Sequence, residues 1–316
     1  MKKGTIRNCR WPQNLRWLFA HVAHHAIPCV VLFAALWSTP VLHASENSRS
    51  AALIDTDTIL AAIRNADFDA PIYVESRQDS DKVEGGIYVL IETPFETLRG
   101  ELSDKGVWCE IIFLHFNIKA CVVDLGSDPT TVSLYSGRLF YQSPDDAHRS
   151  DYVFEAFSFQ DNYLNTVLHG PEGPFGTRDY RIVIQAVPVD ANKSLVHVSY
   201  SLRYNMATRV AQRIYFASAG RHRIGFSVEE NGETSGPVRG VRGMVERNTM
   251  RFYLALEAFL QAPEPDDHIQ RLKNWHALTE AYPDQLRELD LDTYLGYKAK
   301  ERAHQNALQR AANQQD

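Results

Sequence analysis

The sequence has few cysteines and lacks the short motifs that mark several large enzyme classes. No G-x-S-x-G, H-E-x-x-H or Walker-type phosphate loop occurs in its 316 residues. The four cysteines include no C-x-x-C pair, so the usual dithiol redox motif is also missing. We therefore predict no catalytic residue from motifs, and function has to be argued from architecture.

Signals for a metal or a bound cofactor are missing as well. Eight histidines lie beyond residue 45, and no two of them have the i, i+4 spacing of ligands on a helix, so we expect no metal site. Prolines interrupt the glycines of 170–176, and a proline has no N–H to offer a phosphate. This segment predicts a hairpin turn, and we expect no cofactor.

The charge balance argues against a nucleic-acid partner. The first 45 residues contain five basic residues and no acidic one. The rest of the chain has 28 basic and 39 acidic residues, a net charge of −11. A surface with this charge repels phosphates, which disfavours both non-specific nucleic-acid binding and simple electrostatic docking on anionic lipid.

The N-terminal 45 residues have the pattern of an export signal. Basic residues precede an apolar run, Ile27–Trp37, and the small residues Ala44 and Ser45 follow it as a cleavage zone. The alternative is an uncleaved anchor, because 17–41 is nearly long enough to span a bilayer. The short apolar core favours cleavage, so we expect residues 1–45 to be a signal peptide and the mature protein to be periplasmic.

Two cysteines, Cys109 and Cys121, lie beyond the leader. An even number of cysteines in an oxidising compartment favours a disulfide between them, with two buried free thiols as the alternative.

Hydrophobic periodicity predicts an α+β domain. Strands are expected at 72–74, 87–91, 132–135, 153–159, 164–168, 180–189, 195–204 and 223–230. Helices are expected near 55–63, 93–102, 107–114, 208–216 and 244–261, the last being apolar on more than one face. Two polar helices, 267–281 and 292–312, follow, and the second is expected to be a solvated tail.

This order of elements resembles the START-like, or helix-grip, superfamily. The local match begins at Gly86–Phe95, where a strand runs into a helix led by Pro94. Trp108 stands where the family often has a tryptophan, and Gly243–Leu260 resembles its long closing helix. The resemblance covers about 72–261 and implies a curved antiparallel sheet wrapped around a long C-terminal helix, with a cavity between them. Members of the superfamily bind or carry apolar molecules, and some are enzymes.

Strand alternation and helical spacing then predict which residues line that cavity. Those on the sheet are Ile182, Ile184, Val198, Tyr200 and Leu202, and those on the helix are Phe252, Tyr253 and Leu256. Plain core packing is the alternative for each of them.

The sequence thus predicts four regions: a signal peptide (1–45), a leader with a short helix (46–70), a START-like domain (71–262) and a helical extension (263–316). The expected function is binding or transfer of an apolar or amphipathic small molecule. Two alternatives stay open: an enzyme of the same fold that uses His115 or a pocket tyrosine as acid or base, and an envelope module whose C-terminal helices bind a protein. Transient membrane contact also stays open.

Overall fold

The computed structural model describes residues 54–66, 68, 70–218, 220–231 and 234–314. The proposed signal peptide and its cleavage zone lie outside these residues.

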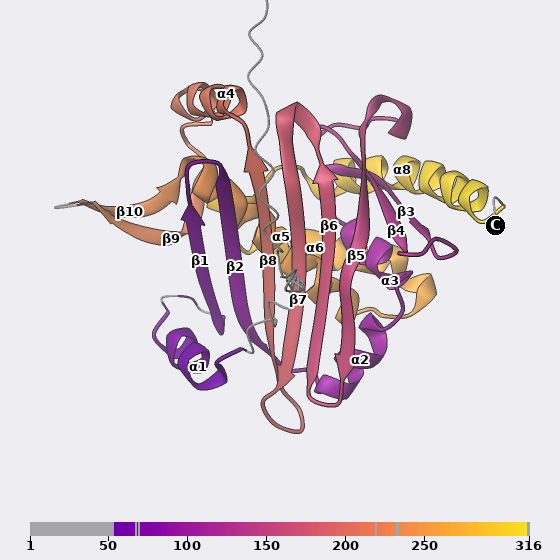
Figure 1. Ribbon diagram of the computed structural model, residues 1–316, viewed down its shortest axis with the longest axis horizontal. Helices are drawn as coiled ribbons and strands as arrows, with labels where there is room; N and C mark the ends of the chain where they lie inside the picture. Colours follow the sequence, from indigo (N-terminus) through magenta and orange to yellow (C-terminus); the bar gives the residue numbers. More distant parts are fainter. Residues whose placement is uncertain (1–53, 67, 69, 219, 232–233, 315–316) are drawn as a thin grey trace, which may run out of the picture. The chain divides into compact units, whose positions relative to one another are not determined.

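An eight-stranded antiparallel sheet forms the centre of the described chain, in the order β1-β2-β8-β7-β6-β5-β4-β3 (Figure 1). The strands are β1 (Ile72–Gln78), β2 (Lys82–Ile91), β3 (Ile118–Asp124), β4 (Thr131–Ser136), β5 (His148–Gln160), β6 (Tyr163–Glu172), β7 (Thr177–Pro188) and β8 (Ser194–Tyr204). From β3 to β8 each strand pairs with the next along the chain, and β8 then pairs with β2. A separate hairpin, β9 (Ile224–Asn231) with β10 (Thr234–Arg239), follows β8.

Helices cover one face of the sheet. Those named in the argument are α1 (Thr56–Arg64), α2 (Phe95–Leu102), α3 (Val107–Ile112), α4 (Met206–Ala217), α5 (Gly240–Leu260), α6 (His268–Glu280), α7 (Pro283–Leu286) and α8 (Leu291–Ala312). Figure 1 shows α5 and α6 behind the strands. A strand that leads into two short helices, an antiparallel sheet and a long helix against it make this an α+β helix-grip fold, as the sequence predicted.

The long helix α5 is buried on most of its surface, which explains its apolar residues on more than one face. The sheet packs on one side of it, and α6 and the β9–β10 hairpin pack on others. Its fully buried Glu246 accepts hydrogen bonds from the backbone N–H groups of Phe226 and Ser227 and from the hydroxyl of Ser76. One carboxylate thereby ties β9 and β1 to the helix, because a buried charge is stable only with such donors.

The last helix, α8, corrects one prediction. Its polar composition predicted a solvated tail, but Lys298, Glu301 and Gln305 are buried against β3, the edge strand of the sheet. Gln305 accepts a hydrogen bond from the N–H of Cys121 at 2.8 Å, and Gln309 bonds both the N–H and the carbonyl of Val123. These polar side chains thus hydrogen-bond backbone groups at the open edge of β3.

Two smaller differences concern short elements. Strands β3 and β10 were not predicted, and Pro94 precedes α2 as its N-cap instead of occupying its first turn. Cys109 on α3 and Cys121 on β3 form a disulfide, with 5.2 Å between their Cα atoms, as predicted.

Candidate functional site

A large, mainly apolar hollow lies beneath α4, and we call it the α4 hollow. Its volume is about 1140 Å³, and it opens to solvent. The walls come from α4, from the β6–β7 loop with Phe175, from the ends of β7 and β8, and from α5. Figure 1 shows α4 standing beyond the end of β8. This volume is slightly above the range of about 300–1,000 Å³ that is typical of small-molecule sites, so a small molecule would fit in it.

A smaller cavity of about 190 Å³, the inner cavity, continues from the α4 hollow between the sheet and α5. The two spaces share Tyr180 and Tyr200 of the sheet, Asn248 of α5 and Asn117. The two spaces therefore adjoin each other along these side chains.

The polar groups of the inner cavity are neutral. Burial, with the nearby cations Arg251, Lys298 and Lys119, lowers the pKa of His115 well below its usual value. Its Nδ1 accepts a hydrogen bond from the N–H of Asn117 at 3.1 Å. Burial raises the pKa of Tyr200 well above its usual value. Among the described residues, no Asp, Glu, Lys or Arg lines the cavity, so it can hydrogen-bond an uncharged polar group, whereas an ion would lose its hydration without a charged partner in the lining.

A third space, the Tyr253 hollow, lies at the other half of α5 and measures about 540 Å³. Tyr253 and Leu256 of α5 line it together with Ile72 and Val196. The hydroxyl of Tyr253 donates to Glu257, so this polar group already has a partner.

The structure distributes the eight predicted pocket residues over these spaces. Ile182 and Phe252 line the inner cavity, Tyr200 lines both it and the α4 hollow, and Leu202 lines the α4 hollow. Tyr253 and Leu256 line the Tyr253 hollow.

The remaining two, Ile184 and Val198, are buried in the middle of the sheet and line none of the three spaces. The described residues therefore hold hollows at both ends of the sheet–α5 interface, with packed core between them.

Sequence reasoning missed the walls that come from α4 and the β6–β7 loop. Phe175 is 92% exposed, and Gln212 of α4 places its Oε1 in a buried position without a hydrogen-bond partner among the described residues. The signal in the sequence was the apolar content of 206–217, interrupted by Arg209 and Arg213. This segment predicts a short helix, and an amphipathic helix shows no target by itself.

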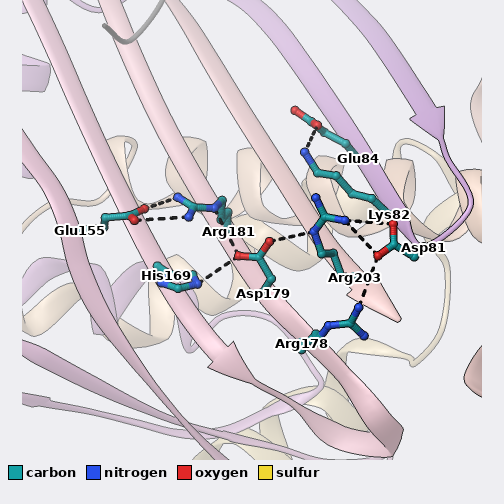
Figure 2. Close-up of polar contacts among 9 residues, drawn as sticks. All are labelled: Asp81, Lys82, Glu84, Glu155, His169, Arg178, Asp179, Arg181 and Arg203. Atoms are coloured by element: carbon teal, nitrogen blue, oxygen red, sulfur yellow. Dashed lines mark hydrogen bonds and ion pairs between the residues drawn. The ribbon is translucent and has the colours of Figure 1, made fainter. Parts of the chain in front are cut away.

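The face of the sheet opposite α5 bears an ion-pair network. Figure 2 shows Asp179 between Arg181 and Arg203, which extends to Asp81. Glu155, Arg178, Lys82 and Glu84 complete the set drawn, with His169 beside Asp179. Each acidic residue drawn has a basic partner, so this cluster has no spare charge for an ionic ligand.

Two searches for other kinds of site gave negative results. Within the described residues, no group of three or more His, Cys, Asp or Glu side chains is placed to hold a metal ion. No helix in the part of the chain that the structure describes is long and apolar enough to span a membrane.

Comparisons with known proteins identify no relative by sequence. No family model matches the chain, and no curated protein does. Among solved structures, a conserved protein of unknown function from Enterococcus faecalis has 8% identity and a TM-score of 0.34, covering 79% of this chain and 97% of that one. A point mutant of norcoclaurine synthase from Thalictrum flavum has 12% identity and a TM-score of 0.33, covering 43% and 86%. Ara h 8.0201 has 10% identity and a TM-score of 0.29, covering 47% and 91%. At these scores the matches identify no family, and the fold assignment rests on the strand order and helices of this chain.

Proposed function

We propose that this protein binds an apolar or amphipathic small molecule in the α4 hollow and the inner cavity. The observation that carries the proposal is the pair of adjoining, mainly apolar hollows, one beneath α4 and one lined by His115. Burial of apolar ligand surface would supply most of the binding free energy, at about 25 cal/mol per Å² before the costs of association.

The polar groups in these hollows fit the uncharged polar part of such a ligand. Gln212 offers an acceptor that lacks a partner among the described residues, and the neutral Tyr200 and Asn248 lie deeper. A few placed polar groups in an apolar pocket fix the orientation of a ligand.

Native mass spectrometry of protein purified from the periplasm tests the proposal. We expect a population with an added mass that organic extraction removes and that an apolar competitor displaces. Protein that carries no such mass and binds no apolar probe would contradict the proposal.

A second candidate is an enzyme of the same fold, which the position of His115 in the wall of the inner cavity favours. A neutral imidazole can act as a base, although the N–H of Asn117 already occupies Nδ1. If the protein is an enzyme, His115→Asn should abolish turnover of the bound molecule but leave its binding measurable. Unchanged turnover would remove His115 from the mechanism.

We also propose that the protein is exported. The Cys109–Cys121 disulfide supports this, because disulfides persist mainly in oxidising compartments. N-terminal sequencing of the periplasmic fraction should give a start near Ala44 or Ser45, whereas Met1 retained in the membrane fraction would indicate an anchor.

A further inference from the structure

A second hollow next to the α4 hollow has the opposite chemical character, and we call it the arginine hollow. It measures about 830 Å³, and four arginines line it: Arg209, Arg213, Arg239 and Arg242. Phe216 lines both the arginine hollow and the α4 hollow, so the two spaces share a wall. A cationic site therefore adjoins the apolar site of the proposed function.

The positive charge of the arginine hollow is only partly compensated. Asp79 and Glu229 are its acidic lining residues, and Glu229 is 2.8 Å from Arg242. Within the described residues, Arg209 and Arg213 form no ion pair. The residues beyond position 45 carry a net charge of −11, so this local excess of cations stands out and favours an anion.

Arg209 points more specifically to a ligand. Its Nε is buried and has no hydrogen-bond partner among the described residues. A buried donor without an acceptor destabilises a protein by roughly 1–3 kcal/mol, so native structures rarely leave one unpaired. An anionic oxygen in the hollow would pair with the guanidinium charge of Arg209, whose side chain lines the hollow.

The N-terminus of α5 adds to the positive electrostatic potential of the arginine hollow. Gly240, the first residue of this 21-residue helix, lines the hollow. The helix has no side-chain cap and no acidic residue in its first turn. The first N–H groups have no side-chain cap among the described residues, so they and the positive end of the helix dipole favour a negative charge at this place.

We propose that the two hollows form one site for an anionic amphiphile, with the apolar chain in the α4 hollow and a phosphate or carboxylate group in the arginine hollow. This inference rests on the proposed function and narrows its ligand class. The neutral inner cavity would reject the anion, whereas the arginines would hold it at the solvent side of Phe216. The ligand class is thus a molecule such as an alkyl phosphate or a fatty acid.

The test compares decyl phosphate with 1-decanol, which has the same chain without the charge, by titration calorimetry on the mature protein. We expect the wild type to bind decyl phosphate at least tenfold more tightly than decanol. Arg209→Gln/Arg213→Gln should reduce the affinity for decyl phosphate about tenfold or more and leave that for decanol unchanged. A matched control, Arg64→Gln/Arg310→Gln, removes two exposed arginines elsewhere and should change neither affinity.

The other outcomes have separate meanings. Equal affinity for the two probes, or no effect of Arg209→Gln/Arg213→Gln on decyl phosphate, would overturn the head-group inference while the apolar site stands. Inorganic phosphate that binds as tightly as decyl phosphate would also overturn it, because the site would then recognise free phosphate. If neither decyl probe binds, the proposed function fails and the inference fails with it. Decanol binding by the variant also shows that it is folded.

Discussion

Individual buried side chains account for two properties that can be measured without knowing the ligand. His197 lies on the face of the sheet opposite α5, stacked on Tyr88 with 4.1 Å between the ring centres, and its Nδ1 is 3.1 Å from Oε1 of Gln185. Burial lowers its pKa to about 4. The folded protein therefore keeps this ring neutral at a pH where the unfolded chain is protonated.

The first prediction is that His197 makes the protein sensitive to mild acid. The unfolded state binds more protons between pH 6.5 and 4, so the free energy of unfolding falls as the pH falls through this window. From pH 7 to pH 5 this one ring should lower the free energy of unfolding by about 2 kcal/mol. In urea unfolding, the free energy of unfolding of His197→Gln should fall by about 2 kcal/mol less than that of the wild type between pH 7 and pH 5. The exposed control His148→Gln should behave as the wild type. An identical loss in His197→Gln would contradict the neutral assignment.

The second prediction concerns the buried charge cluster of β3 and α8. Glu301, fully buried, lies 2.9 Å from Lys119 and 3.1 Å from Lys298, and burial lowers the pKa of Lys298 to about 8. Glu301→Gln would leave two buried ammonium groups without a carboxylate, which should destabilise the protein by about 3–5 kcal/mol. Glu96→Gln, which breaks an exposed pair with Arg99, should cost less than about 1 kcal/mol. If both substitutions lowered the free energy of unfolding equally in denaturant, burial would not determine how much Glu301 contributes to stability.

At the scale of elements, the sequence predicted the strands and the central helix well, because alternation and helical spacing record which side chains are buried. It missed β3 and misjudged α8, whose buried residues are mostly polar. Helix α8 looked solvated because Lys298, Glu301 and Gln309 are polar, yet they bond an edge strand that α8 covers. No local pattern distinguishes a glutamine that faces water from one that pairs with a distant strand.

The same limit applies to the candidate site. The sheet and α5 residues of the pocket could be grouped by periodicity, but the packed middle formed by Ile184 and Val198 could not be predicted. Whether such a position faces a hollow depends on the volumes of its neighbours in three dimensions. The role of α4 was missed for a related reason, because a helix covers a hollow only when long-range topology places it there.

The third prediction is that α8 belongs to the folded domain. Deletion of 291–316 would expose the N–H groups of Cys121 and Val123 and the carbonyl of Val123, an open edge that promotes aggregation. We expect the truncated chain to aggregate or to lose its cooperative melting transition. A soluble monomer with wild-type melting would instead make α8 a separate module, as the protein-interaction alternative requires.

At the scale of the whole molecule, the fold divides the interface between the sheet and α5 into a packed centre and hollow ends. The apolar end lies beneath α4, and the arginines lie on the other side of Phe216. This arrangement would place a ligand near the protein surface instead of in the packed centre of the interface between the sheet and α5.

The position of the hollow determines which substitution should block binding. Val198 is 0% exposed in the packed centre, so Val198→Trp should destabilise the protein by about 1–3 kcal/mol or more through overpacking. Ala211 of α4 lines the α4 hollow, so Ala211→Trp should obstruct part of that space while the melting transition changes little.

The most direct test of the proposed function is therefore 1-decanol binding to the wild type and to Ala211→Trp, with thermal melting of both proteins. We predict saturable binding by the wild type, and for the variant an affinity at least tenfold weaker with melting within a few degrees of the wild type. Binding that Ala211→Trp leaves unchanged would place the ligand elsewhere, and a wild type that binds no decanol would contradict the account.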